Sequence, residues 1–144
     1  MNNDKTLLAD LLVAAHRLTR IAAQSLGSTT PSAVWHTLSI LSTDGPLRVG
    51  ELASIARVSQ PSMTKVVHQL IGDNLVDRIV DPEDSRASLV TVLPAGINAL
   101  ADWRQALASA LHPMFSGLTV EDRRTLTRAV DILSVRTTSQ KSVA

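Results

Sequence analysis

Cysteine and tyrosine are absent from this chain of 144 residues, and aromatic residues are scarce, with one phenylalanine and two tryptophans. Without cysteine the chain can form no disulfide framework, no thiolate redox centre and no cysteine-ligated zinc site. Aromatic residues make up only 2% of the chain, whereas hydrophobic residues make up 44%. The core therefore has to be built from leucine, isoleucine, valine and alanine, and such small side chains favour closely packed helices.

Long hydrophobic runs and a dominant charge are absent as well. No run approaches the roughly 20 apolar residues that span a bilayer, and residues 1–5 do not resemble the start of an export signal. We therefore expect a cytoplasmic protein that does not enter the membrane. The net charge of +1 neither requires nor excludes a polyanionic partner. The mean hydropathy of +0.14 is high for this length and favours a subunit interface.

The motifs of the common enzyme classes are also missing. The sequence contains no P-loop, dinucleotide fingerprint or nucleophile elbow. Its four histidines, His16, His36, His68 and His112, fall on different predicted elements without metal-ligand spacing. We therefore expect a protein that is not an enzyme and that carries no metal and no cofactor.

Two long helices are predicted at the start of the chain, because apolar residues repeat there at spacings of three and four. The first covers residues 5–24 and ends at Gly27-Ser28. The second begins with Thr30 as its N-cap and Pro31 as its first residue, and it ends at residues 44–46. The predicted buried stripes are Leu7, Leu11, Ala14, Leu18 and Ile21 in the first helix and Val34, Leu38 and Leu41 in the second.

Two further helices are predicted at the end of the chain. Pro94 begins one, which Pro113 and Gly117 break. Thr119 and Asp122 form a capping signal for the other, and residues 137–144 are predicted to be a flexible polar tail. The predicted buried stripes are Leu100, Trp103, Leu107, Ala110 and Met114 in the one and Leu126, Val130 and Leu133 in the other.

Shorter elements are predicted between residues 47 and 93. The stretch "VGELASIA" predicts a two-turn helix with Gly50 as its N-cap and with Leu52, Ile55 and Ala56 buried. Ser59 then caps a helix that starts "QPSMTKVVHQLI". Its apolar side is made of Met63, Val66, Val67 and Leu70, and its opposite side of Pro61, Thr64, Lys65, His68 and Gly72.

A β-hairpin is predicted after these two helices. Its strands are "VDRIV" and "SLVTVL", and residues 81–87 form the turn. Two helices joined by a tight turn and followed by a hairpin form a winged helix-turn-helix, whose second helix enters the major groove of DNA. The predicted fold is therefore mainly α with a small β-hairpin wing. Arg86, at the wing tip, is predicted to reach the minor groove, whose negative potential attracts arginine.

The stretches "ELASIARVSQPSMTKVVHQLI", "NLVDRIVDPEDSRASLVTVLPAG" and "GLTVEDRRTL" resemble the MarR (multiple antibiotic resistance regulator) family. The resemblance implies a homodimer, with residues 5–45 and 94–136 forming the dimerisation layer and residues 47–93 forming one DNA-binding lobe per subunit. Members usually repress nearby genes from a pseudo-palindromic operator, and many release DNA when a small aromatic or phenolic ligand binds between the two layers. This chain departs from the family pattern at Gly50, Asn74 and Pro94.

The candidate DNA-binding residues lie on the second helix of the motif and on the wing. Asp84 is expected to support the wing. A ligand pocket, if present, is placed by the resemblance near Arg17, Trp35 and His36. The candidate DNA contacts are Ser59, Gln60, Pro61, Ser62, Thr64, Lys65, His68 and Arg86.

Each of these residues also has a simpler interpretation. Thr64, Lys65 and His68 can form an ordinary solvated helix face, Arg86 can be a turn arginine paired with Asp84, and the tryptophans can be core fillers. Residues 47–93 carry five basic and six acidic residues, although phosphate contacts supply much of the affinity for DNA. DNA binding therefore requires the acids to be engaged or turned away. The alternative function is a winged-helix module that binds a protein instead of DNA.

Overall fold

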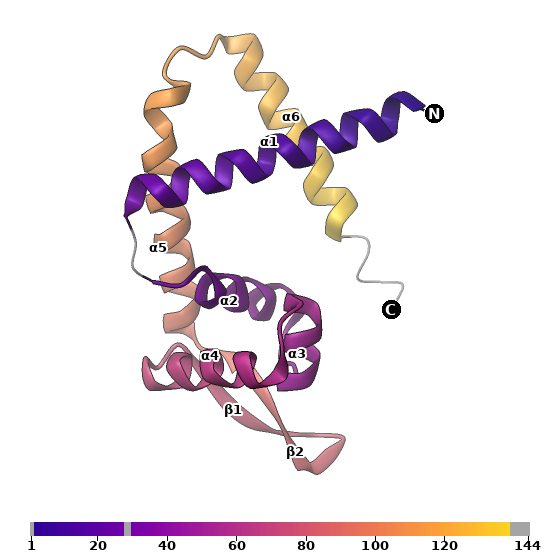
Figure 1. Ribbon diagram of the computed structural model, residues 1–144, viewed down its shortest axis with the longest axis vertical. Coiled ribbons are helices and arrows are strands. Elements are labelled where there is room, and N and C mark those ends of the chain that lie inside the picture. Colours follow the sequence, from indigo (N-terminus) through magenta and orange to yellow (C-terminus); the bar gives the residue numbers. More distant parts are fainter. Residues whose placement is uncertain (1, 28–29, 139–144) are drawn as a thin grey trace. The chain divides into compact units, whose positions relative to one another are not determined.

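The structure is a computed structural model that describes residues 2–27 and 30–138. Within these ranges the predicted mainly α fold with a β-hairpin wing is confirmed (Figure 1). None of the described helices is long and apolar enough to cross a membrane. The elements in chain order are α1 (Asn2–Leu26), α2 (Ser32–Asp44), α3 (Val49–Ala56), α4 (Gln60–Gly72), β1 (Val76–Asp81), β2 (Asp84–Val92), α5 (Pro94–Leu111), the 3-10 helix η1 (His112–Phe115) and α6 (Val120–Thr138).

The chain divides into two compact units, Met1–Ala110 and Leu111–Ala144. The first unit holds a single aliphatic core, to which α2, α3, α4, both strands and the start of α5 contribute. Leu38, Leu52, Val67, Leu70 and Val90 are fully buried in it. The prediction that aliphatic side chains build the core is confirmed, and this core holds the helix-turn-helix and the hairpin together.

The helix ends follow the predicted turn chemistry with one difference. Gly45 ends α2 with a positive φ of 77°, and Asn74 takes the left-handed conformation, with φ 59°. The predicted start of the second helix is wrong by one residue, because Pro31 is the N-cap and Ser32 the first helical residue. Pro31 has an extended ψ of 139°, which places it outside the helix.

Helix α3 has the predicted ends, but two details of the prediction are wrong. Its N-cap is Arg48 and not Gly50, and the carboxylate of Glu51 accepts a hydrogen bond from the Arg48 backbone N–H. Ile55 is 46% exposed, whereas Ala53 is buried. At about 100° per residue, an inner face centred between Leu52 and Ala53 excludes Ile55.

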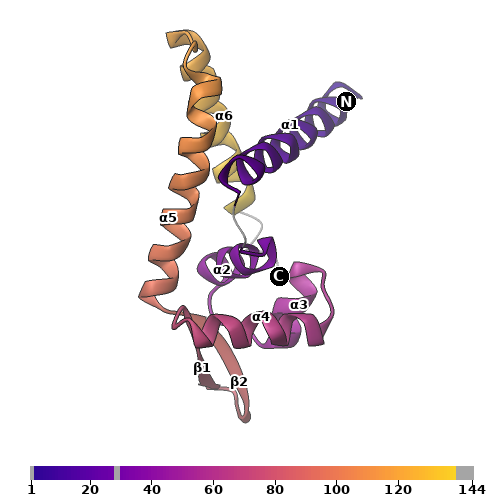
Figure 2. The same ribbon diagram turned by 60° about the vertical axis from the view of Figure 1, so that its left-hand side comes forward.

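The hairpin is longer than predicted, and its turn is shorter. Strands β1 and β2 pair antiparallel from Val76–Val92 to Val80–Ser88, and Asp81 pairs with Asp84 beyond an irregularity that leaves residues 85–87 unpaired. The predicted turn over residues 81–87 therefore shrinks to residues 82–83. Leu47 adds a bridge to the other edge of β2 through two backbone hydrogen bonds with Val90, of 3.1 and 2.7 Å. The hairpin projects beyond α3 and α4 (Figure 2).

The predicted apolar stripe of α1 is left largely uncovered within its own unit. Leu11 and Ile21 are half-buried, but Leu7 is 64% exposed and Leu18 is exposed as well. Adjacent apolar side chains of α1 that were not in the stripe, including Leu12 and Val13, are also exposed. The helix therefore carries an apolar face that its own unit does not bury.

The second unit shows the same feature. No described residue of α6 is buried, and Leu126, Val130 and Leu133 are exposed. The predicted cap is confirmed, because Thr119 Oγ1 accepts a hydrogen bond from the Asp122 N–H at 3.0 Å, and Asp122 accepts one from the Thr119 N–H at 3.4 Å.

The observed helix that begins at Pro94 ends before the last residue of the predicted apolar stripe. Its first residue is Pro94 as expected, but α5 ends at Leu111, and Met114 lies exposed in η1. The predicted flexible tail begins too early, since Thr137 and Thr138 belong to α6. Residues 139–144 lie outside the described residues.

Gly96 gives a test of how tightly α5 packs on the winged lobe. A Cβ at this position would overlap the carbonyl oxygen of Leu75 and would lie 2.8 Å from Val92 Cγ2. We expect Gly96→Ala to lower the free energy of unfolding by about 1–3 kcal/mol, measured by urea denaturation, because backbone has to move. The matched control is Gly72→Ala, where no atom lies within 4 Å of the new Cβ. Equal stability of both variants would contradict this account.

Candidate nucleic-acid interface

The outward side of α4 is set by the cap and the core beneath it. Ser59 Oγ accepts a hydrogen bond from the Ser62 N–H at 3.2 Å, and Pro61 lies in the first turn, where its missing N–H breaks no bond. Because Met63, Val67 and Leu70 are buried, the opposite side is turned to solvent. Gln60, Pro61, Lys65 and His68 are exposed there.

Two of the candidate contacts have hydroxyl groups that the helix itself engages. The Ser59 hydroxyl donates to Ser62 Oγ at 2.8 Å. The Thr64 hydroxyl donates to the Gln60 carbonyl at 2.9 Å, and Thr64 is half-buried. Their oxygens keep free acceptor capacity, but their protons are already used. Lys65 is therefore the candidate on α4 whose charged group is fully available.

A groove of about 540 Å³ lies where α4, the start of α3 and the hairpin meet. Gln60 and Thr64 are the predicted site residues that line it. The Gln60 side chain lies about 3.5 Å from the position that a Cβ on Gly50 would take. The remaining lining residues, which were not among the predicted site residues, are Arg48, Val49, Gly50, Glu51, Arg78 and Ser88.

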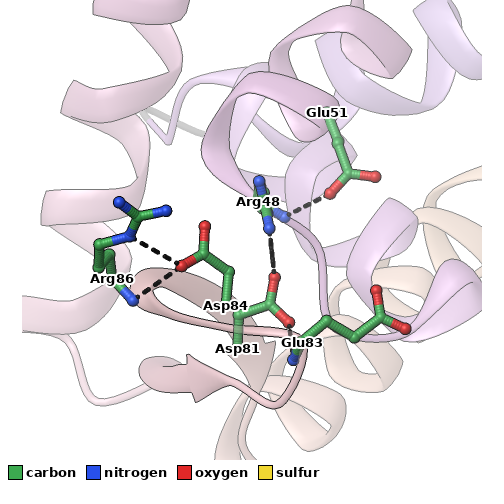
Figure 3. Close-up of polar contacts among 6 residues, drawn as sticks. All are labelled: Arg48, Glu51, Asp81, Glu83, Asp84 and Arg86. Atoms are coloured by element: carbon green, nitrogen blue, oxygen red, sulfur yellow. Dashed lines mark hydrogen bonds and ion pairs between the residues drawn. The ribbon is translucent and has the colours of Figure 1, made fainter.

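Arg86 lies in β2 and not in the turn, which corrects the predicted position. It belongs to the unpaired residues 85–87, two residues after β2 begins. Its side chain is 91% exposed, and the Asp84 carboxylate accepts hydrogen bonds from its backbone N–H at 3.1 Å and its Nε at 3.4 Å (Figure 3). The sequence predicted that Asp84 supports the wing, and its carboxylate bonds the backbone N–H and Nε of Arg86 (Figure 3).

A second arginine holds the base of the hairpin tip. Arg48 donates from Nε at 3.0 Å and from Nη2 at 2.7 Å to Oδ2 of Asp81, while Asp81 Oδ1 accepts the Glu83 N–H at 2.9 Å (Figure 3). The hydrogen bond from Glu83, followed by the one from Arg48, lowers the pKa of Asp81 below its ordinary value. The hydrogen bond to Asp81, followed by the negative charge of that carboxylate, raises the pKa of Arg48.

The acids of the lobe are largely engaged by its own donors. Four of the six carboxylates between residues 47 and 93 accept hydrogen bonds from backbone N–H groups or arginines: those of Glu51, Asp77, Asp81 and Asp84. Asp77 accepts the Arg78 N–H at 2.8 Å. The acidic excess of this segment is therefore not concentrated on the outward side of α4, where Lys65 is the charged residue.

The two tryptophans form a separate feature of the first unit. Trp35 and Trp103 stack with ring centroids 5.0 Å apart and an angle of 11° between the planes. Both line a cavity of about 430 Å³, together with His36 and with Thr19 of α1. Trp35 Nε1 is buried, and it has no hydrogen-bond partner among the described residues.

Arg17 is not among the residues that line this cavity. It lines a groove along α1 with Leu12 and Arg20, because a residue two positions before Thr19 points about 200° away around the helix. A different cation lies near the cavity: Arg104 Nη2 donates to Oγ of Ser39, a lining residue, at 3.1 Å.

The histidines remain on separate elements, His16 on α1, His36 on α2, His68 on α4 and His112 in η1. Across the described ranges, no group of three or more histidine, aspartate or glutamate side chains is arranged to hold a metal ion.

Sequence reasoning missed Arg48 and Arg104 because their partners are distant in the chain, and it missed Arg78 because the groove that this residue lines is assembled from α3, α4 and the hairpin. Arg48 and Asp81 are 33 residues apart, and Arg104 and Ser39 are 65 apart. One weak signal exists for Arg78: it lies two residues after buried Val76 and therefore on the same face of the strand. For Arg48 and Arg104 no local pattern identifies the partner.

The comparisons with known proteins agree with this architecture. The family model described as "MarR family" matches residues 31–88. The chain is similar to the HTH-type transcriptional regulator MT0903.1 of Mycobacterium tuberculosis, with 31% identity over 92% of this chain and 94% of the relative. It is also similar to the HTH-type transcriptional repressor IacR of Pseudomonas putida, with 26% identity over 69% of this chain and 59% of the relative.

Solved structures share the fold. The transcriptional regulator Tm0710 of Thermotoga maritima matches with a TM-score of 0.71 at 20% identity, over 97% of this chain and 99% of that one. BpsR of Bordetella bronchiseptica matches with a TM-score of 0.57 at 22% identity, over 86% and 89%. Together with the MT0903.1 relative, which is similar over nearly its whole length, the matching family model shows that this chain belongs to the MarR family of DNA-binding winged-helix transcriptional regulators, which are not enzymes.

Proposed function

We propose that the protein is a homodimeric repressor that occupies a pseudo-palindromic operator, with α4 of each subunit in the major groove and the hairpin beside the minor groove. The observation that carries the proposal is the outward side of α4, where Gln60 and Lys65 are exposed opposite the buried residues of the helix. Two such helices on a two-fold axis meet major-groove segments about 10 base pairs apart. The name of the relative IacR, a transcriptional repressor, supports repression.

The uncovered apolar faces of α1 and α6 support dimerisation. Each face carries large exposed side chains, among them Leu12 at 70% and Val135 at 66%. Monomeric proteins rarely leave such faces open. We therefore assign residues 5–45 and 94–136 to the dimerisation layer and residues 47–93 to the DNA-binding lobe.

The positions of the charged residues in the lobe are compatible with DNA binding, although their sum is slightly acidic. Lys65 is exposed on α4, and Arg86 is exposed on the hairpin. Arg78 lines the groove where α3, α4 and the hairpin meet. Several acids of the lobe are held by backbone N–H groups. We propose that Lys65 and Arg78 contact phosphates and that Arg86 inserts into the minor groove.

Lys65→Ala tests the phosphate contact. Loss of one phosphate contact per subunit should flatten the slope of log K against log salt by about one unit per subunit. The measurement is fluorescence anisotropy with a duplex from the promoter region beside the protein's own gene, at several salt concentrations. Lys141→Ala is the matched control, because it removes the same charge from a residue outside both the proposed DNA-binding lobe and the proposed dimerisation layer.

An unchanged slope for Lys65→Ala would remove Lys65 from this role. Absence of DNA binding by the unaltered protein at low salt would contradict the repressor and favour the alternative, a winged-helix module that binds another protein. A lone subunit in analytical ultracentrifugation at working concentration would contradict the dimer.

We further propose that a small aromatic anion in the tryptophan cavity releases the DNA. The cavity offers a stacked aromatic wall, the Trp35 Nε1–H without a partner among the described residues, and Arg104 beside Ser39. A carboxylate near a guanidinium and a ring against tryptophan are favourable contacts. In a structural neighbour, BpsR, 6-hydroxynicotinic acid regulates DNA binding. That ligand belongs to the proposed class, because 6-hydroxynicotinic acid is a small aromatic acid.

Intrinsic fluorescence tests the effector site. Trp35 and Trp103 are the only tryptophans, and the chain has no tyrosine, so all emission comes from this cavity. We expect benzoate and 6-hydroxynicotinate to change the emission and to weaken DNA binding. Arg104→Ala should weaken the response to the anion about tenfold, whereas Arg17→Ala should not. Equal effects of the two substitutions would contradict the role given to Arg104.

A further inference from the structure

We propose that Arg48 and Asp81 form a latch that fixes the hairpin against the start of α3 and thereby positions Arg86 for DNA. The inference rests on the proposed function. Neither residue touches DNA in this scheme. Both are positioning residues, which act through the place and order of the hairpin tip.

The latch is built at the point where the hairpin loses its regular pairing. The ladder is regular from Val76 to Val80, and the shift in register falls between Val80 and Asp81. Beyond this point residues 85–87 have no partner on β1. Since backbone pairing beyond this point is reduced to the pair Asp81–Asp84, side-chain contacts contribute to holding the tip.

Asp81 supplies those contacts with both carboxylate oxygens. Oδ2 accepts two hydrogen bonds from Arg48, and Oδ1 accepts the Glu83 N–H of the turn. Asp81 and Thr37 are the two buried polar residues in the described part of the chain. A carboxylate that is buried beside a guanidinium and bonded through both oxygens restricts the conformations of its segment.

Arg48 is in turn anchored in the lobe and does not move freely. It is the N-cap of α3, and its N–H donates to the Glu51 carboxylate at 3.1 Å. The preceding residue, Leu47, is bonded to Val90 of β2 through both its N–H and its carbonyl. The latch therefore connects the tip of the hairpin to the rigid base of the lobe, and Figure 3 shows the chain of contacts from Glu51 to Glu83.

The titration of Asp81 gives a first test. Its neighbouring charges are Arg48, Glu51, Glu83 and Asp84. The folded-state pKa of Asp81 lies below the ordinary 3.8. The ionised carboxylate therefore stabilises the folded state above pH 3.8, and this stabilisation is lost as the pH falls through the lowered pKa. We expect the carboxyl carbon of Asp81 to titrate below 3.8 in an NMR experiment and its pKa to rise on Arg48→Ala. An unchanged pKa would contradict the ion pair.

Hydrogen exchange without DNA tests the latch itself. Asp81→Ala should speed exchange of the hairpin amides near the tip and leave the core amides of α2 and α4 unchanged. The matched control, Asp77→Ala, removes the same charge from an exposed residue of β1 whose carboxylate is bonded to the neighbouring Arg78 N–H. Equal protection of the tip in Asp81→Ala and Asp77→Ala would overturn the latch.

DNA affinity tests the positioning role, and the sign of the effect is decisive. Removing an acid should strengthen binding through electrostatics alone, and we expect this of Asp77→Ala. Asp81→Ala should instead weaken binding about tenfold, and in the Arg86→Ala background it should weaken binding less than about twofold, because the two effects are coupled.

Asp81→Ala binding as tightly as Asp77→Ala, or losses that add fully with Arg86→Ala, would overturn the positioning role. Where a core amide of Asp81→Ala also exchanges faster, Asp81→Asn replaces it in both measurements. If the unaltered protein binds no DNA, the proposed function fails, and the exchange experiment still decides whether the latch holds the hairpin.

Discussion

The winged lobe depends on the burial of a small aliphatic core shared by α2, α3, α4, both strands and the start of α5. Leu38, Leu52, Leu70 and Val90 meet there with almost no exposed surface. Burial of each such side chain contributes roughly 1.5–3 kcal/mol. Since these residues come from different elements, the core is what holds the helix-turn-helix and the hairpin in one orientation.

The candidate DNA-binding surface follows from this core. Because Met63 and Val67 turn inward, Lys65 turns outward, and the register of β1 and β2 carries Arg86 beyond the last regular pair. The core does not reach the hairpin tip, where hydrogen bonds take its place. Asp84 orients Arg86, and Asp81 connects the turn to Arg48. The surface is thus held by two kinds of force, apolar burial beneath α4 and charge-assisted hydrogen bonds along the hairpin.

The chain combines this well-buried lobe with helices whose apolar faces stay open. In α6 no described residue is buried, although its apolar side chains repeat at helical spacing. The high mean hydropathy of the sequence is explained by these faces and not by a large core. A second copy of the chain is the partner that we propose for them, because a symmetric partner carries the same complementary faces.

Much of the fold was determined by the sequence alone. The ends of α3, the Ser59 cap with Pro61 in the first turn, and the left-handed Asn74 follow from local rules of backbone geometry and hydrogen bonding. The apolar face of α4 follows from its spacing. These features depend on residues within one or two turns of each other, so a linear pattern contains them.

Other features were decided only by the tertiary structure. Ile55 is exposed and Ala53 is buried because the neighbouring helices choose the face of α3 that packs. Arg86 lies in β2 and not in the turn, because Asp81 and Asp84 pair beyond the predicted strand ends. Arg17 lines a different groove from the tryptophans, whereas Arg104 is bonded to a residue that lines their cavity. The partners of Arg48 and Arg104 are 33 and 65 residues away. Such contacts exist only once the core has brought distant segments together, and no local pattern in the chain encodes them.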